Sequence, residues 1–324
     1  MFPQEFYQQV VVTPLIRYQG LNTSWREIWM KDETKQITHS FKFRGNFFRL
    51  LEAPPNSTVV TASTGNHALG MATAAKILCL RAQVFVPATI SQLKVQAITD
   101  LGAKVVVVDG DFDACKCEAE KCSATTGAPY ISGFDDLSII RGHSSLFYEI
   151  HDQYPQGFDV VFVPVGGGGL LAGCLQYYQG TKTKVVGVEL DSVPSMKVAL
   201  AAGKQVTLPP ATTRTEGLLV RTAGIVPFQI AQQAEHLEIV LVSDALIQRT
   251  IRLLWECNSI RAEGAGAAAL TAALHYQQAS WDQRVMVVVS GGNIDEKHFQ
   301  EALYGEMVEI YKTAPFGGRD VLRS

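Results

Sequence analysis

A lysine between two aromatic side chains is the first residue whose setting points to chemistry. Lys42 lies between Phe41 and Phe43 in the segment Ser-Phe-Lys-Phe-Arg-Gly. A lysine among apolar groups loses hydrating water, so its pKa falls and its neutral amine becomes a candidate for a Schiff base with a carbonyl group. Taken alone, the segment fits a solvated lysine at the start of a helix better.

A run of four glycines is the second such feature. Residues 166–169 follow the apolar segment Val-Pro-Val and precede a helical pattern that begins at Leu170. Glycines let backbone N–H groups approach a phosphate, and the start of the next helix favours negative charge. The run has neither the Gly-Lys-Ser/Thr of a P-loop nor the spacing of a dinucleotide fold. Because a tight turn needs fewer glycines, the segment predicts a phosphate site without identifying the phosphate.

Short apolar runs and helical stretches alternate along the chain and must position these residues. The runs predict strands at residues 58–61, 83–86, 105–108, 160–163, 185–188, 239–242 and 285–289. Stretches rich in Ala, Leu, Gln and Lys predict helices between them, such as 67–77, 91–101 and 262–275, and further helices are expected at 43–51 and 113–126. Most strands are apolar throughout, which is typical of parallel strands that helices cover on both faces. The alternation indicates an α/β fold.

The composition is that of a globular protein without a strongly charged surface. The chain has 324 residues, 47% of them hydrophobic and 18% charged, with a net charge of −3. The length suggests two domains or one large one, and the charge gives no general attraction for nucleic acid or an anionic membrane. Neither a membrane-length apolar run nor a signal-peptide pattern is present. The six cysteines form no disulfide framework, so we expect a cytoplasmic protein with neither nucleic-acid nor membrane partners.

Four motifs in a fixed order resemble those of the fold-type II pyridoxal-phosphate enzymes. Residues 40–45 resemble the lysine motif of that family, and residues 63–67 (Ser-Thr-Gly-Asn-His) resemble the next motif of threonine and serine dehydratases and serine racemases. Residues 166–170 are similar to the family's phosphate loop, and residues 290–293 (Ser-Gly-Gly-Asn) to its motif for the ring nitrogen. Thr13-Pro14-Leu15 matches a typical opening. The ordered set covers nearly the whole chain and is far more specific than any one motif.

The resemblance implies a tryptophan synthase β-like α/β fold, with two parallel or mostly parallel sheets and helices on both faces. It implies a large cofactor-binding domain from residues 1–37 and 142–324 and a small substrate-side domain from residues 38–141. The cofactor is then expected in the cleft between them. Homodimers are common in the family, so we expect one. The sequence ends shortly after Asn293, so we expect no regulatory domain of the kind that biosynthetic threonine dehydratases carry.

Similarity to the family also implies which residues hold pyridoxal phosphate. Lys42 is expected to bind it covalently and to remove the substrate's Cα proton. Phe41 is expected to pack against its ring and Asn66 to bind its ring hydroxyl. Ser290 is expected to bind its pyridine nitrogen, and a neutral hydroxyl there favours β-elimination over transamination because it does not keep the nitrogen protonated. The expected phosphate-binding residues are Gly166, Gly167, Gly168, Gly169 and Leu170.

The second motif is expected to bind the carboxylate of an amino-acid substrate. By similarity, Ser63, Thr64, Gly65 and His67 do so largely through backbone amides, as the start of a helix can. Thr64 stands where serine racemases carry a serine that acts on the opposite face of the substrate carbon. A threonine hydroxyl is bulkier and its rotamers are restricted, which speaks against racemisation.

The sequence offers two possible metal sites, and it favours neither. Glu189 matches the first carboxylate of the divalent-cation site that many relatives have, but Ser195 occupies the second position. Hard cations need several oxygen ligands, so a divalent cation is not expected. Cys115, Cys117 and Cys122 lie in a predicted helix that points Cys115 and Cys117 to different faces, which disfavours zinc.

Four residues keep two interpretations each. His39 replaces a glycine of the lysine motif and either lines the site or caps a turn. Arg141 and His143, in the segment that resembles Gly-Gln-Gly-Thr, face either the substrate side chain or the surface between the domains. Glu263 either tunes the cofactor or begins the following helix as a first-turn acid.

These features predict a pyridoxal-phosphate lyase of amino-acid catabolism that converts L-threonine or L-serine to a 2-oxo acid and ammonia. Alternatives are a dehydratase of threo-3-hydroxyaspartate, phenylserine or a hydroxyectoine-derived compound, an amino-acid racemase, and a β-replacement synthase. Synthases usually read Gly-Asn-Thr where this chain has Asn66 followed by His67, which favours the dehydratases. A non-catalytic protein that binds pyridoxal phosphate or a phosphorylated metabolite is the alternative outside enzymes.

Overall fold

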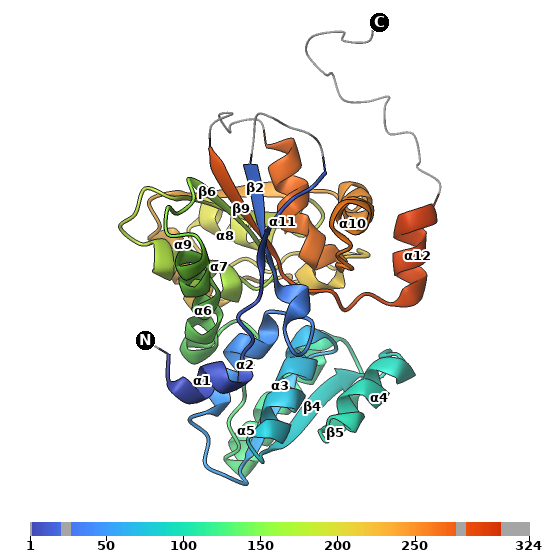
Figure 1. Ribbon diagram of the computed structural model, residues 1–324. Helices are drawn as coiled ribbons and strands as arrows, with labels where there is room; N and C mark the ends of the chain where they lie inside the picture. The colour runs from blue at the N-terminus through green and yellow to red at the C-terminus, as the bar shows by residue number, and fades with distance from the viewer. Residues whose placement is uncertain (1, 21–26, 277–282, 306–324) are drawn as a thin grey trace, which may run out of the picture.

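The computed structural model describes residues 2–20, 27–276 and 283–305, which form two β-sheets and the helices around them (Figure 1). The strands of the larger sheet are β1 (Leu15–Arg17), β2 (Glu27–Asp32), β6 (Val160–Pro164), β7 (Lys184–Leu190), β8 (Leu237–Val242) and β9 (Arg284–Val289). This six-stranded sheet has the order β1-β2-β9-β6-β7-β8. β1 runs antiparallel to β2, and all other neighbours are parallel.

Helices cover the larger sheet on both faces, as continuous apolar strands predict. In β9, Val285, Val287 and Val289 face one core, and Met286 and Val288 face the other. The first core contains α10 (Asp244–Asn258), α11 (Gly264–His275) and α12 (Glu296–Tyr304). The second contains α6 (Leu137–Gln153), α7 (Gly169–Tyr178), α8 (Ser195–Ala202) and α9 (Ile225–Gln232).

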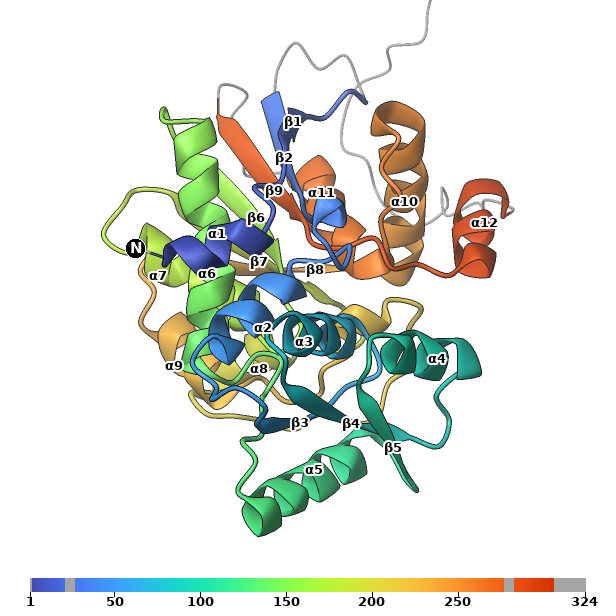
Figure 2. The same cartoon turned by 60° about the horizontal axis from the view of Figure 1, so that its bottom comes forward.

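The smaller sheet has three parallel strands, β3 (Thr58–Ala62), β4 (Arg81–Pro87) and β5 (Lys104–Val108). One face packs against α2 (Lys42–Leu50), α3 (Asn66–Ile77) and α4 (Gln92–Asp100). The other face packs against α5 (Phe112–Thr126). Figure 2 shows these strands between α5 on one side and α3 on the other. The remaining elements are α1 (Gln4–Gln9) and the short 3₁₀ helices η1 (Glu33–Lys35) and η2 (Glu216–Leu218).

Capping residues set the ends of several helices. The Asp111 carboxylate accepts the backbone N–H groups of Asp113 and Ala114 at the start of α5, and Gly127 ends that helix with a φ of 73°. The Asp136 carboxylate accepts two N–H groups at the start of α6 in the same way. Within α5, Cys115 is buried and Cys117 is exposed. The two side chains therefore lie on different faces of the helix, as predicted.

The α/β class and all seven predicted strands are confirmed, and β1 and β2 were not predicted. β2 contains Glu27, Lys31 and Asp32, and charges are rarely buried, yet Lys31 and Asp32 are at most 1% exposed. The division into domains stays a prediction: the smaller sheet lies within residues 38–141, while α2 packs against both α3 and α6. Among the described residues, no helix combines the length and apolar character needed to cross a membrane.

Candidate active site

Two neighbouring strands of the larger sheet end at the predicted cofactor residues. β6 is followed by the glycine run, and its neighbour β9 is followed by Ser290. Parallel strands place their carboxyl ends at one edge of the sheet, where ligands of α/β proteins bind. The Ser290 side chain is 2% exposed, and its hydroxyl donates to the Ala265 carbonyl oxygen at 3.1 Å in the first turn of α11.

The glycine run leaves no room for side chains. A Cβ on Gly167 would lie 2.3 Å from the Phe134 ring, and one on Gly168 would lie 2.7 Å from both Met196 and Pro227. Gly168 has a φ of 95° and directly precedes α7, where no side chain caps the helix. The first-turn N–H groups of a helix have no acceptor within it, so these donors are available to an anion.

Lys42 begins α2, and the chain before it is hydrogen-bonded to the end of β9. The Phe41 N–H donates to the Ser290 carbonyl oxygen at 3.1 Å, and the Gly292 N–H donates to the His39 carbonyl oxygen at 2.9 Å. The Lys42 amine donates to the Gly133 carbonyl oxygen at 2.6 Å and lies 5.1 Å from the centre of the Phe41 ring. Burial lowers the pKa of Lys42 to about 8, against a smaller opposing effect of Glu263. Much of this amine is therefore neutral at mildly alkaline pH.

Asn66 lies beside Glu263 rather than alone. Its amide nitrogen donates to Glu263 Oε1 at 2.6 Å, and its amide oxygen accepts from the Asn293 amide at 2.7 Å. Burial raises the pKa of Glu263 to about 7, although the hydrogen bond from Asn66 lowers it in part. The Glu263 side chain makes no capping hydrogen bond to α11. Its contact is thus with a predicted cofactor residue, not with the helix that it precedes.

The predicted substrate motif forms the turn between β3 and α3. The Gly65 N–H donates to the Ser63 hydroxyl at 3.3 Å, and no side chain caps the start of α3. His67 is 5% exposed, and its Nε2 lies 3.0 Å from the Thr61 hydroxyl and 3.2 Å from the Ile131 carbonyl oxygen. Burial lowers the pKa of His67 to about 3, with a further contribution from Lys42, so the ring is neutral. His67 therefore offers no charge to an anion, and the donors of this turn are its backbone N–H groups and the hydroxyls of Ser63 and Thr64.

The structure gives different surroundings to His39, Arg141 and His143, for which the sequence allowed two interpretations each. His39 has a φ of 54°, and its ring Nδ1 lies 2.9 Å from the Thr34 carbonyl oxygen, so it stabilises a turn. Arg141 is exposed and lies over the Phe48 ring. His143 is fully buried, with its ring against Phe41 at 4.7 Å and neither ring nitrogen bonded to the protein.

Glu189 has a structural task. Its oxygens accept the backbone N–H groups of Met196 at 2.7 Å and Lys197 at 2.9 Å, and so cap α8. The part of the chain that the structure describes contains no group of three His, Cys, Asp or Glu side chains able to hold a metal. Among the described residues, Glu189 therefore has no neighbouring side chains that could complete a metal site with it.

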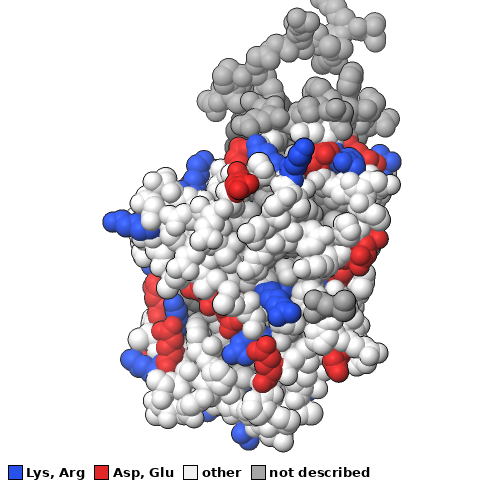
Figure 3. Space-filling model, turned by 90° about the vertical axis from the view of Figure 1, so that its left-hand side faces the viewer, with Lys and Arg blue, Asp and Glu red and all other residues white. Residues whose placement is uncertain are grey.

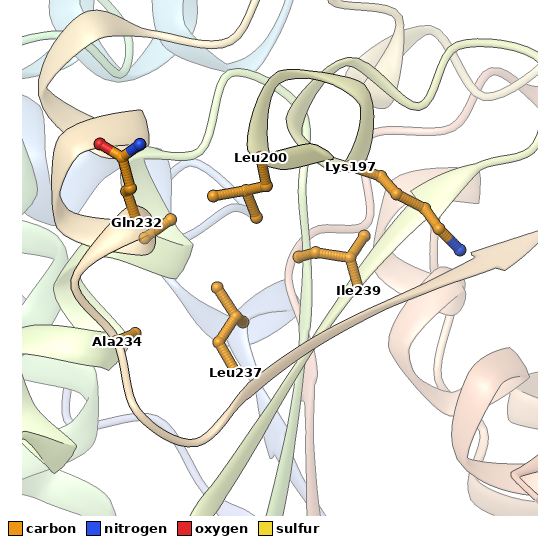
Figure 4. A pocket seen from close by; sticks show the side chains of 7 residues that line it. Lys197, Leu200, Gln232, Ala234, Leu237 and Ile239 are labelled. Carbon is orange, nitrogen blue, oxygen red and sulfur yellow. The ribbon is translucent and has the colours of Figure 1, made fainter. Parts of the chain in front are cut away.

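A hollow of about 310 Å³ lies elsewhere, between α8, α9 and β8 (Figure 4). Lys197, Leu200 and Ile239 are among the residues that line it, and no predicted site residue does. Because the hollow contains none of the residues that the motifs predict, we place the chemistry at Lys42.

Sequence reasoning missed the segment that joins the smaller sheet to α6. Gly133 accepts the Lys42 amine, the Phe134 ring fills the space beside Gly167, and the Asp135 carboxylate accepts the N–H groups of Ile225 and Val226 at 3.0 and 2.8 Å. A backbone carbonyl has no signature in a sequence. The pattern Gly-Phe-Asp between two elements was the available signal, and it is typical of any turn.

Pyridoxal phosphate fits these residues. Gly167 and Gly168 shape a backbone cradle that a Cβ would fill, and the uncapped start of α7 suits a phosphate. The partly desolvated Lys42 amine suits a bond to the cofactor's aldehyde carbon. Phe41, Asn66 and Ser290 converge on the same edge of the larger sheet through the contacts described above.

Comparisons with known proteins agree with this fit. The family model "Pyridoxal-phosphate dependent enzyme" matches residues 7–291. The chain is 34% identical to the biosynthetic L-threonine dehydratase of Halalkalibacterium halodurans over 90% of this chain and 72% of that protein. It is also 34% identical to an L-threonine ammonia-lyase of Geobacter sulfurreducens, over 83% of this chain and 68% of that protein.

A solved structure shows the same architecture. The processed form of threonine deaminase isoform 2 from Solanum lycopersicum superposes with a TM-score of 0.85 at 30% identity, covering 93% of this chain and 90% of that one. The matched family model, the two relatives and this structure lead to one conclusion. The chain belongs to the family of pyridoxal-phosphate-dependent enzymes and has the fold-type II architecture.

Proposed function

We propose that this protein is an ammonia-lyase that converts L-threonine or L-serine to the corresponding 2-oxo acid and ammonia. The observation that carries the proposal is the placement of the Lys42 amine, partly desolvated and hydrogen-bonded to Gly133, on a segment tied to Ser290. The dehydratase and ammonia-lyase names of the relatives support the reaction and the choice of substrate.

In the proposed mechanism, each group of residues has one task. The N–H groups at the start of α7 hold the cofactor's phosphate, and those at the start of α3 hold the substrate carboxylate. Pyridoxal phosphate supplies the electron withdrawal that makes the Cα proton acidic. Lys42 takes this proton with its neutral amine, and the β-hydroxyl group leaves as hydroxide, which a proton converts to water. Water then hydrolyses the released enamine to the 2-oxo acid and ammonia. Ser290 offers a neutral hydroxyl to the ring nitrogen, which favours elimination over transamination.

The test is a panel of amino acids assayed for release of a 2-oxo acid. It includes L-threonine, L-serine, D-serine, threo-3-hydroxyaspartate and phenylserine, with Lys42→Ala and, as a control, the exposed-lysine variant Lys121→Ala. We expect turnover of L-threonine or L-serine, a loss of about a thousandfold or more in Lys42→Ala, and wild-type rates in Lys121→Ala. Inversion without 2-oxo acid release would assign a racemase. Visible cofactor absorption without any turnover would leave a binding protein.

The remaining proposals concern assembly and location. Figure 3 shows the side on which α6, α7 and α9 lie, where a broad area of the upper half carries no charged side chains. Tyr148 on α6 and Ile225 on α9 are 48% and 53% exposed. An exposed, charge-poor face supports a homodimer, and light scattering tests it.

All six cysteines are free thiols, which supports a cytoplasmic location. The proposed reaction degrades its amino acid, which is compatible with a catabolic role.

A further inference from the structure

Beside Lys42 lies a buried group of charged side chains to which the proposed reaction assigns no task. We name Lys31, Glu33, Arg44 and Glu149 the Arg44 cluster, because Arg44 contacts both carboxylates. Its Nε and Nη2 donate to Glu33 at 2.7 and 2.9 Å, and its Nη1 and Nη2 donate to Glu149 at 2.5 and 2.9 Å. Lys31 donates to Glu149 at 2.7 Å. All four side chains are at most 3% exposed.

The cluster is balanced in charge and well supplied with hydrogen bonds. Two cations face two carboxylates, and Thr13 connects them, because its hydroxyl donates to Glu33 at 2.5 Å and accepts from Arg44 at 3.2 Å. Arg44 also donates to the Ser145 hydroxyl at 3.3 Å and to the Val11 carbonyl oxygen at 3.2 Å. The two carboxylates raise the pKa of Arg44 despite its burial, so it stays charged.

Stability alone does not account for such a cluster. Taking ions out of water is costly, and well-packed apolar side chains of similar size often hold a core together equally well. What ions add is geometry: a planar guanidinium held in two forks has one position relative to its carboxylates. The elements that the forks join therefore indicate what is being positioned.

Those elements connect Lys42 to the edge of the larger sheet. Arg44 lies in the first turn of α2, two residues after Lys42. Glu33 follows β2 directly, and β2 pairs with β9 up to the partners Asp32 and Val289, one residue before Ser290. The fork between Arg44 and Glu33 thus adds to the backbone hydrogen bond from Phe41 to Ser290.

The second carboxylate comes from α6, where α2 makes a close contact. A Cβ on Gly142 would lie 2.7 Å from the Arg44 carbonyl oxygen and from the Gly45 Cα. Ser145 and Glu149 follow Gly142 at helical spacing on the same face of α6, so both point at Arg44. The partners of the cluster come from the N-terminal segment, β2, η1, α2 and α6. None belongs to β3–β5 or to α3–α5.

We propose that Arg44 is a positioning residue, which holds the first turn of α2 and the amine of Lys42 against the end of β9 through partners outside the smaller sheet. The inference rests on the proposed role of Lys42. It also assigns the start of α2 to the cofactor side of the molecule, although the predicted domain boundary places residue 42 on the substrate side.

The decisive variant is Arg44→Lys, which keeps the charge and removes the fork. The control is Leu254→Ala in α10, a fully buried residue in a core that contains neither α2 nor α6. Both variants are expected to lower the unfolding midpoint. The first readout uses the full chain before cofactor loading: the pH dependence of acylation of the Lys42 amine, followed by mass spectrometry of its peptide. The second is kcat and KM of the loaded enzyme.

A loosened α2 admits water to the amine, so Arg44→Lys is expected to move the apparent pKa of Lys42 from about 8 toward the ordinary lysine value of 10.5. We expect its kcat to fall by about tenfold or more and its KM for the amino acid to stay within about twofold, because misplacement of a reacting group affects the chemical step. Leu254→Ala is expected to leave the pKa and kcat at wild-type values.

The outcomes separate this inference from the proposed function. If Arg44→Lys loses stability but keeps the pKa and kcat of the control, the cluster is structural only and the inference is wrong. If no amino acid is turned over, the acylation readout still decides, because it needs no catalysis. Should Arg44→Lys fail to fold, Thr13→Val replaces it, since it removes only one hydroxyl from the cluster. A smaller pKa shift in the same direction supports the inference, and an unchanged pKa overturns it.

Discussion

The larger and the smaller sheet surround Lys42 with very different packing. On the side of the larger sheet, a Cβ on Gly167 or Gly266 would lie within 2.3 Å of another atom, and Ser290 is buried. On the side of the smaller sheet, a Cβ on Gly65 would meet nothing within 4 Å. Two of the ion pairs that join this side to the larger sheet, Lys94–Glu216 and Arg221–Asp113, are largely exposed.

This difference in packing indicates that the two sides have different functions. A closely packed cradle has one shape, as a tightly held cofactor requires, whereas a side joined to it by exposed ion pairs can shift relative to that cradle. Variants on the side of the larger sheet should therefore change cofactor affinity, and variants on the side of the smaller sheet should change KM.

The largest effect is expected from Gly167→Ala. The new methyl group would overlap the Phe134 ring, and such overpacking costs about 1–3 kcal/mol. We expect the Kd for pyridoxal phosphate, measured by fluorescence titration, to rise by up to about a hundredfold. The double variant Gly167→Ala/Phe134→Ala makes room for the methyl group and should recover most of the affinity. An unchanged Kd in the single variant would contradict the closely packed cradle.

A pH-dependent effect is expected from Glu263→Gln, at the border between the two sides. The pKa of Glu263 is about 7 in the folded protein, against an ordinary value of 4.5. The folded state thus holds this proton more tightly, and the stability it contributes is fully present below pH 4.5 and is lost as the pH rises through 7. Glutamine keeps the hydrogen bond to Asn66 and cannot ionise. The urea midpoint of Glu263→Gln should therefore exceed that of the wild type by more at about pH 8.5 than at about pH 5.

The matching control is Glu120→Gln, on an exposed face of α5. We expect its midpoint to differ from wild type by the same amount at both pH values. An equal offset in Glu263→Gln would show that burial does not hold the Glu263 proton.

The smallest effect is expected at the exposed pair between Lys94 and Glu216, which lie 2.7 Å apart. Exposed pairs contribute about 0–1 kcal/mol, so each alanine variant should change KM by less than about fivefold and leave the cofactor Kd unchanged. The double variant measures the coupling, which salt should reduce further. A coupling well above 1 kcal/mol would mean that this pair holds the two sides rigidly, contrary to the comparison.

One of the two strands that were not predicted, β2, shows what local sequence patterns cannot contain. The strands predicted correctly are apolar, so their burial is visible in their own residues. β2 is buried as well, but Lys31 is neutralised by Glu149, 118 residues away. No window of sequence around Lys31 shows that partner, and a charged residue without a visible partner is assigned to the surface.

The candidate site also contains residues that the sequence predicted and residues that it did not. Lys42, Ser290 and the glycine run were predicted because their residue types, in this order, resemble the motifs of a known family. The Gly133 carbonyl and the Phe134 ring act through position, which other residue types could supply. Glu263 had an ordinary interpretation as a first-turn acid, and only the fold brings it to Asn66, 197 residues away in the chain.

The place of β9 in the larger sheet has a consequence for biosynthesis. β9 is the last strand of the described chain, yet it lies between β2 and β6. On the ribosome, the smaller sheet is complete once residue 108 has emerged. β2 and β6 must then wait for residues 284–289 before they share a sheet, and Ser290 arrives with them. A growing chain can thus fold its smaller sheet early, but it cannot complete the larger sheet or place Ser290 beside the glycine run until residue 290 has been translated.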